Sequence, residues 1–311
     1  MQKQLLLDTH KRILPFIHKT PILKSSLISK IAGAELFFKC ENFQRMGAYK
    51  MRGATNAILL LSEQARSAGV VTHSSGNFAQ ALALAAQSLG VKAYIVMPSS
   101  APGIKIKAVE QYGGYISICE PTLLSREAAS MKIQKNTGAT FIHPSNNMDV
   151  ILGQGTAAME LLADAPDLEG IVVPVGGGGL LAGTALSVHY FGQSCQVFGG
   201  EPFEADDAYR SMISGKIEGN TSTNTIADGL KTVLGNKNFP IIQKYVKGII
   251  RVSEDEIISA MHLIWERMKI IVEPSSAVAL AAVLREKEKF SAKKIGIIIS
   301  GGNVDLEHLP F

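Results

Sequence analysis

Residues 174–183 read PVGGGGLLAG, four consecutive glycines between an apolar run and a Leu/Ala-rich stretch. Glycine has no side chain to pack, and ordering it costs more conformational entropy than ordering other residues. We therefore expect something to approach this backbone closely. Backbone N–H groups that converge just before a helix bind anions, because the helix start carries partial positive charge. The run predicts a phosphate site; a tight strand-to-helix turn is the simpler alternative.

The same stretch also fits a dinucleotide fingerprint. Gly177, Gly179 and Ala182 match the pattern G-x-G-x-x-A, in which the glycines permit a tight turn beside a pyrophosphate. Glu201 ends the next expected strand, about where a ribose-binding acid belongs. This loop alone leaves a nicotinamide-dependent oxidoreductase and other phosphate-binding proteins open.

The surrounding sequence alternates between β-rich runs and helical stretches, which indicates an α/β fold. Four short runs between residues 67 and 145 predict a small parallel sheet, and a second α/β block follows. We expect surface loops over 203–230, which are rich in small polar residues. The expected strands are GVVTH (69–73), KAYIVM (92–97), YISIC (115–119), TFIH (140–143), GIVVPV (170–175), QVFGGE (196–201) and KIGIIIS (294–300), and helices are expected around EDEIISAMHLIWERM (254–268) and from Pro274 through two serines into AVALAAVLREK.

Composition narrows the class of protein. The chain has 311 residues, 46% hydrophobic and 19% charged, with a net charge of +4, which argues against a nucleic-acid partner. Cys40, Cys119 and Cys195 are widely spaced and odd in number, so we expect no disulfide framework, no zinc site and a cytoplasmic location. Residues 170–192 lack Asp, Glu, Lys and Arg, but their glycines favour a buried strand, loop and helix over a membrane span. The start, MQKQLLLDTH, has too short an apolar run for a signal peptide.

Three loops directly follow expected strands. They are Ser74–Asn77 (SSGN), Gly176–Gly179, and Ser300–Asn303 (SGGN). In open parallel sheets, ligands gather outside the carboxyl ends of the strands. These loops are therefore the parts of the chain from which a binding site is expected.

One lysine stands in an unusual context. Residues 41–54 read ENFQRMGAYKMRGA, so Lys50 lies between an aromatic residue and glycines. A desolvated lysine has a lowered pKa and forms an imine with an aldehyde. If the expected phosphate belongs to pyridoxal 5′-phosphate, Lys50 would hold the aldehyde while the glycine run holds the phosphate. One ligand then explains both features.

Six motifs occur in the order seen in the fold type II pyridoxal-phosphate enzymes. They are ENFQ-x-x-G-x-[FY]-K-x-RGA, SSGN, VGGGGLLAG, TIADGLKT, EPSSAVALAA and SGGN. The chain most resembles their serine racemase and threonine/serine dehydratase branch, over nearly its whole length. The resemblance implies a two-domain, tryptophan synthase β-like fold. Residues 1–66 and 146–311 would form a large cofactor-binding domain, and 67–145 a small α/β domain that closes over the substrate.

The resemblance also implies a role for each matched residue. Lys50 would be the Schiff-base lysine and the proton carrier on one face of the substrate α-carbon, and Ser75 the acid/base on the opposite face. For the cofactor, the implied contacts are Tyr49 beside it, Asn77 at the ring hydroxyl, Gly176, Gly177, Gly178, Gly179 and Leu180 at the phosphate, and Ser300 at the pyridine nitrogen. Ser74, Asn77 and Arg126 match positions that contact the substrate carboxylate, and Glu201, the Ala205 carbonyl and Asp207 match a divalent-metal site for Mg²⁺.

The implied activity is a dehydratase, or ammonia-lyase, that converts L-serine or L-threonine to pyruvate or 2-oxobutyrate and ammonia, with racemase activity because Ser75 is present. A serine at the pyridine nitrogen, unlike a carboxylate, would not keep that nitrogen protonated. Serine or hydroxyaspartate racemisation and dehydration as the main activity stays open. Two functions from other classes also stay open: an NAD-dependent oxidoreductase and a non-catalytic amino-acid-binding module. We expect a homodimer that binds a small amino acid and neither nucleic acid nor membrane.

The chain departs from the family pattern at four places. Ala48 replaces a serine, and Phe78 replaces the histidine of SSGNH, a donor to the substrate carboxylate. Arg45-Met46 and Ser145 replace Lys-Thr and Asn, which in animal serine racemases belong to a nucleotide-binding site between subunits. These changes argue against activation by ATP.

Overall fold

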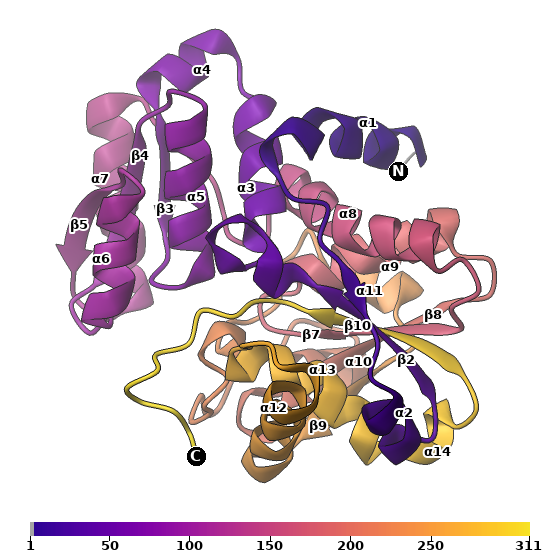
Figure 1. Ribbon diagram of the computed structural model, residues 1–311. Coiled ribbons are helices and arrows are strands. Elements are labelled where there is room, and N and C mark those ends of the chain that lie inside the picture. Colours follow the sequence, from indigo (N-terminus) through magenta and orange to yellow (C-terminus); the bar gives the residue numbers. More distant parts are fainter. Residues whose placement is uncertain (1–2) are drawn as a thin grey trace.

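Two separate sheets organise residues 3–311, the part of the chain described by this computed structural model (Figure 1). The larger sheet has six strands in the order β1-β2-β10-β7-β8-β9, and only β1 runs antiparallel to its neighbour. Its first two strands come from the N-terminal part of the chain. The strands are β1 (Ile22–Leu23), β2 (Glu35–Cys40), β7 (Gly170–Pro174), β8 (Gln196–Pro202), β9 (Gly248–Val252) and β10 (Lys294–Ile299).

The smaller sheet has the order β5-β4-β3-β6, and every pair in it is parallel. The four strands expected between residues 67 and 145 are therefore confirmed, as is the α/β fold class. In Figure 1 this sheet, with the helices around it, lies to one side of the larger sheet. Its strands are β3 (Val70–His73), β4 (Ala93–Pro98), β5 (Tyr115–Cys119) and β6 (Thr140–Phe141).

The helices cover both sheets, and α3 connects the two parts because it packs against α5 beside the small sheet and α8 beside the large one. The helices are α1 (Lys3–Ile13), α2 (Ser26–Ala32), α3 (Lys50–Leu59), α4 (Glu63–Ala68), α5 (Asn77–Ser88), α6 (Gly103–Gln111), α7 (Leu123–Thr137), α8 (Met148–Asp164), α9 (Gly179–Phe191), α10 (Asp207–Ser214), α11 (Phe239–Tyr245), α12 (Glu254–Met268), α13 (Pro274–Arg285) and α14 (Lys287–Phe290), with 3₁₀ turns η1 (Leu14–Phe16), η2 (Glu41–Phe43), η3 (Arg45–Gly47), η4 (Phe203–Ala205) and η5 (Asp228–Leu230).

The apolar segment 170–192 is a buried strand, loop and helix, as expected. β7 is fully buried, the glycines follow, and α9 begins at Gly179. Gly178 precedes the helix with φ of 77°, a left-handed conformation that side chains other than glycine rarely adopt. No helix among the described residues is long and apolar enough to cross a membrane.

The expectation of loops throughout 203–230 was wrong over α10. Ala208 and Ser211 are fully buried on one face of this helix, so tertiary packing stabilises a segment whose polar composition indicates a loop. Asp207 lies in the first turn, and Gly215 ends the helix in the left-handed conformation. The expected helices at α12 and α13 are confirmed, and α13 begins at Pro274.

Candidate active site

Lys50 is the first residue of α3, at the junction between the two sheets. The preceding turn is held against the loop after β10, because Tyr49 N donates to the Ser300 carbonyl at 3.0 Å and Ala48 forms a bridge with Gly301. Within this turn Met46 has a φ of 55°, a strained value for a residue with a side chain. The lysine and the SGGN loop, 250 residues apart in sequence, thus form one unit.

The Lys50 side chain is half-buried, and its amine donates to the Pro144 carbonyl at 3.0 Å. The amine lies 5.0 Å from the centroid of the Tyr49 ring and 5.8 Å from that of Phe78. Burial lowers the pKa of the amine to about 8, and the Glu273 carboxylate partly offsets this. A substantial fraction is therefore neutral near physiological pH, as a nucleophilic amine must be.

The glycine run is buried, and its N–H groups are free. Within residues 3–311, the backbone N–H groups of 176–181 donate to no acceptor, whereas the next one, on Ala182, donates to the Gly178 carbonyl. Buried N–H groups without partners are rare in proteins. Those of 176–178 precede α9, and those of 179–181 lie in its first turn, where a helix leaves its N–H groups unpaired. Buried together, they fit an anion such as a phosphate. The tight-turn alternative explains the backbone conformation of Gly178 but not the free donors.

The same loop also requires glycine for packing. A Cβ on Gly176 would lie 2.9 Å from the Gly229 carbonyl oxygen, and one on Gly177 would lie 2.3 Å from Ser145 Oγ. Ser145 directly follows Pro144, whose carbonyl accepts from the Lys50 amine. The lysine and the glycine run therefore converge on one short segment, in agreement with a single ligand bound at both ends.

Ser300 directly follows β10 and is almost fully buried, and its hydroxyl lies 2.9 Å from that of Ser276 in the first turn of α13. Ser276 also contacts both the N–H and the carbonyl of Gly301, each at 2.7 Å. In the sequence, the two serines of EPSS fit helix initiation as well as a catalytic role. In the structure, Ser276 connects the helix to the loop after β10.

Glu273, a buried carboxylate, begins the motif EPSSAVALAA, but the sequence predicts no role for it in the site. The Asn77 side-chain amide donates to both oxygens of Glu273, at 2.9 and 3.0 Å, and its oxygen accepts from Asn303 at 2.9 Å. Burial raises the pKa of Glu273 to about 7, and the Asp228 carboxylate acts in the same direction. Glu273 joins the SSGN and SGGN loops through Asn77 and Asn303.

Ser74 and Ser75 lie on the turn between β3 and α5, both half-buried. The Ser74 hydroxyl accepts weakly from Gly76 N at 3.4 Å, while the Ser75 hydroxyl has no hydrogen-bond partner within residues 3–311. Phe78, on the first turn of α5, brings this segment within 5.8 Å of the Lys50 amine. The Ser75 hydroxyl is therefore free to contact a substrate.

Burial lowers the pKa of His73, and the positive charge of Arg126, on α7, acts in the same direction. The His73 ring lies 6.2 Å from that of His143, whose pKa falls to about 4 through burial, with His73 and Lys50 acting in the same direction. The ring nitrogen Nδ1 of His143 accepts from the N–H groups of Ser145 and Asn146. This neutral histidine, unnoticed in the sequence, shapes the turn that carries Pro144.

The residues assigned to a metal lie together in a buried turn. Glu201 accepts from Ala208 N at 3.0 Å and Tyr209 N at 2.9 Å, while Asp207 accepts from Asn220 and from Leu234 N, both at 2.9 Å. Burial raises the pKa of Asp207 to about 6, and burial followed by repulsion from Asp207 raises that of Glu201 well above its usual range.

Two buried carboxylates that repel each other suit a divalent cation. Residues 3–311 hold no group of three or more His, Cys, Asp and Glu side chains arranged for a metal. Glu201 is fully buried, and backbone N–H groups occupy both its oxygens.

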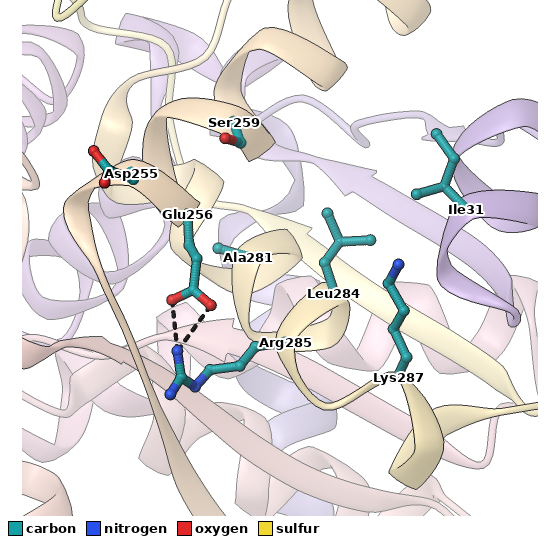
Figure 2. A pocket seen from close by; sticks show the side chains of 8 residues that line it. All are labelled: Ile31, Asp255, Glu256, Ser259, Ala281, Leu284, Arg285 and Lys287. Carbon is teal, nitrogen blue, oxygen red and sulfur yellow. Dashed lines mark hydrogen bonds and ion pairs between the residues drawn. The ribbon is translucent and has the colours of Figure 1, made fainter.

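A shallow depression of about 270 Å³ lies elsewhere, among α2, α12, α13 and α14 (Figure 2). Arg285 donates to both oxygens of Glu256 there, at 2.8 and 2.9 Å. Ile31 and Leu284 provide its apolar lining. None of the residues discussed above lines it, so it is separate from the Lys50 site.

Known proteins resemble this chain over most of its length. Residues 13–301 match the model of a family described as "Pyridoxal-phosphate dependent enzyme". A serine racemase of Dictyostelium discoideum is 51% identical over 97% of this chain and 94% of its own length, and its crystal structure superposes with a TM-score of 0.94. A beta-hydroxyaspartate dehydratase of Paracoccus denitrificans is 45% identical over 98% of this chain and 97% of its own. The crystal structure of a threonine deaminase from T.th. is 40% identical, covers 98% of this chain and 99% of its own, and has a TM-score of 0.93.

Proposed function

The chain belongs to the family of pyridoxal-phosphate-dependent enzymes, and from that membership we propose that it is a dehydratase of small β-hydroxy amino acids with an accompanying racemase activity. Its products from L-serine and L-threonine would be ammonia with pyruvate or 2-oxobutyrate. The observation that carries the proposal is the half-buried Lys50 amine, with a pKa of about 8, beside the free N–H groups of the glycine run. The relatives named serine racemase, beta-hydroxyaspartate dehydratase and threonine deaminase support this choice of chemistry.

The residues of the site fit the cofactor. We propose that the N–H groups of 176–180 bind its phosphate, that Lys50 holds its aldehyde, and that Ser300 meets its ring nitrogen. When bound, pyridoxal phosphate supplies the electron sink that makes the α-hydrogen of an amino acid removable. We propose that Tyr49 and Phe78, whose rings lie near the Lys50 amine, shield that end of the site from water.

The chain itself supplies the proton transfers and the orientation. Lys50 would remove the α-proton from one face, and Ser75 would donate or remove a proton on the other. We propose that Ser74, Asn77 and Arg126 orient the substrate carboxylate. The Asn77 side-chain amide already donates to both oxygens of Glu273. Its two hydrogens would therefore be shared between Glu273 and the bound cofactor and substrate. Loss of the substrate β-hydroxyl competes with return of the proton, which accounts for two activities at one site.

We further propose that Glu201, the Ala205 carbonyl and Asp207 bind Mg²⁺. The support is chemical: two buried carboxylates with raised pKa values would be relieved by a cation. Addition of Mg²⁺ should raise the melting temperature of the chain, and Asp207→Asn should remove most of that effect. An unchanged melting temperature at saturating Mg²⁺ would reject this site.

The domain boundaries at 66/67 and 145/146, a homodimeric assembly and a cytoplasmic location are also part of the proposal. The separate four-stranded sheet supports the boundaries, and three free cysteines support a reducing compartment. We propose a small amino acid as the substrate, and neither a nucleic acid nor a membrane as a partner.

The activity is tested by incubating the cofactor-loaded chain with L-serine, L-threonine and 3-hydroxyaspartate, and measuring keto acid, ammonia and the inverted amino acid. We expect keto acid from at least one of them and D-serine from L-serine. Lys50→Ala should abolish both. A loaded chain that forms neither product from any of the three would reject the proposed function.

A further inference from the structure

The Lys50 amine shares its hydrogen-bond acceptor with a second side chain. The Pro144 carbonyl accepts from Lys50 Nζ at 3.0 Å and from Gln154 Nε2 at 3.3 Å. A carbonyl oxygen has two lone pairs, so it can accept both hydrogen bonds at once. It has no hydrogen to give, so the lysine and the glutamine must both be donors.

The orientation of Gln154 leaves one of its own atoms unpaired. Gln154 is fully buried on α8, and its side-chain oxygen has no hydrogen-bond partner within residues 3–311. An unpaired buried acceptor is unfavourable. The reversed amide would be no better, because it would bring its oxygen against the Pro144 carbonyl, which is also an acceptor. Gln154 therefore fixes the Pro144 carbonyl from the side of α8.

His143 fixes the same turn from within. Its Nδ1 accepts from Ser145 N at 3.2 Å and from Asn146 N at 2.9 Å, so the ring spans the residue whose carbonyl faces Lys50. Backbone N–H groups can only donate, so Nδ1 carries no hydrogen and the hydrogen of the neutral ring is on Nε2. The pKa of His143, lowered to about 4 chiefly by burial, keeps the ring in this form near physiological pH.

Asn147 forms the same arrangement four residues later. Its side-chain oxygen accepts from Asp149 N at 2.8 Å and from Val150 N at 3.1 Å. These N–H groups lie two and three residues ahead, which is the spacing seen at His143. Such local contacts fix the backbone of a turn. An asparagine oxygen can therefore do in this chain what the His143 ring nitrogen does.

We propose that His143 is a positioning residue: by fixing this turn, it holds the Pro144 carbonyl where that oxygen binds the free Lys50 amine. The inference rests on the proposed function, in which Lys50 takes the α-proton and returns it. A lysine side chain is flexible, and an acceptor already in place restricts its amine to one position. The same oxygen stabilises the ammonium that forms when the amine takes the proton.

The direct test measures the pKa of Lys50 in the cofactor-free chain. Its lysines are labelled competitively with acetic anhydride at a series of pH values, and mass spectrometry gives the extent of labelling at Lys50. His143→Leu removes the nitrogen that fixes the turn, so the ammonium form of Lys50 loses its acceptor. We expect its pKa to fall by roughly one unit from about 8, the scale of one hydrogen bond to a charged group.

This shift would report the contact and not the loss of a charge. His143, with a pKa of about 4, is neutral where Lys50 titrates. Glu273, the charged group that acts on the Lys50 amine, stays in place in the variant. An unchanged pKa of Lys50 in His143→Leu would overturn the proposal.

Two further variants separate positioning from general support of the fold. His143→Asn supplies an acceptor, as Asn147 does, and should keep the pKa of Lys50 close to that of the unmodified chain. His73→Leu makes the same change as His143→Leu in the neighbouring ring, 6.2 Å away, although the N–H groups of the turn donate to His143. It should leave the pKa of Lys50 unchanged. Equal shifts in the two leucine variants, or no rescue by His143→Asn, would show the proposal to be wrong.

A measurement on the unmodified chain does not depend on the folding of any variant. The ¹⁵N resonances of the histidine rings, assigned from the backbone, report the tautomer of each ring. Near neutral pH we expect His143 to carry its hydrogen on Nε2. A hydrogen on Nδ1 would overturn the proposal, because that nitrogen could not then accept from the turn.

Failure of this inference is distinguishable from failure of the proposed function. If the unmodified chain attaches no pyridoxal phosphate to Lys50, the proposed function fails and the purpose assigned to the Pro144 carbonyl fails with it. Attachment at Lys50, together with an unchanged pKa of Lys50 in His143→Leu, overturns the inference alone.

Discussion

Asn77 Nδ2 donates to both carboxylate oxygens of Glu273, at 2.9 and 3.0 Å, and so joins the first residue of α5 to the residue that precedes α13. The two residues are 196 positions apart in sequence. The contact connects a helix beside the small sheet to a helix beside the large one. Glu273 is buried, with only 4% of its surface accessible to water.

The first prediction concerns the stability of the cofactor-free chain. Burial raises the pKa of Glu273 from 4.5 to about 7, so the folded state retains a proton that the unfolded state releases. The stabilising contribution of this group is complete below about pH 4.5 and is lost as the pH rises to about 7, a loss of about 3 kcal/mol. Glu273→Gln should remove this decline. Denaturant unfolding at about pH 5 and about pH 8 measures it, and an unchanged difference between the two pH values would contradict the account.

The second prediction concerns Arg52, which lies in the same motif as Lys50 (KMRGA) but stabilises the fold. Arg52 is fully buried, and its guanidinium donates to Glu41 at 2.7 Å and Glu160 at 2.8 Å. Arg52→Met would leave two buried carboxylates without this partner. We expect the free energy of unfolding to fall by about 3–5 kcal/mol, as for other broken buried pairs.

The control for this change is Lys24→Met, which breaks an exposed pair with Glu35 at 2.9 Å. Exposed pairs contribute little, so its free energy of unfolding should stay close to that of the unmodified chain. Denaturant titration measures the free energy of unfolding of both variants. Equal losses in the two would contradict the account.

The third prediction concerns the glycine run. A Cβ on Gly176 would lie 2.9 Å from both the Gly229 carbonyl oxygen and the Leu230 Cα, backbone atoms that cannot turn aside. Gly176→Ala should displace the loop and weaken pyridoxal-phosphate binding by about tenfold or more. Fluorescence titration gives the Kd. Gly219→Ala, where a Cβ meets nothing within 4 Å, is the matched control and should leave the Kd unchanged. Equal Kd values for both variants would show that the run does not hold the phosphate.

The fourth prediction separates the two activities. Because the Ser75 hydroxyl is assigned to the face opposite Lys50, Ser75→Ala should lower the formation of D-serine from L-serine by about 100-fold or more. Formation of pyruvate from L-serine should largely persist. Chiral chromatography and a keto-acid assay measure the two rates on one sample. If both activities survive intact, the role assigned to Ser75 is wrong.

Local motifs made the fold and part of the site predictable. The four strands of the small sheet, strands β7, β8 and β10 of the large one, and the helix after the glycine run follow from patterns within a few residues. Strands β1, β2 and β9 of the large sheet were not predicted. Contacts between distant segments do not leave such a pattern. In the sequence, the stretch EPSS fits the start of a helix as well as a catalytic role. It does not reveal that Glu273 faces Asn77 or that Ser276 faces Ser300. Helix α10 was missed because packing of Ala208, and not local propensity, stabilises it.

The most direct measurement is reduction of the cofactor-loaded chain with borohydride, followed by mass spectrometry of its peptides. The account predicts a cofactor-sized mass on the peptide that contains Lys50, and none on the matching peptide of Lys50→Ala. Attachment should be favoured above about pH 8, where the lowered pKa leaves the amine mostly neutral. A well-folded chain, saturated with pyridoxal phosphate, that carries the mass on another lysine or on none would contradict the central claim.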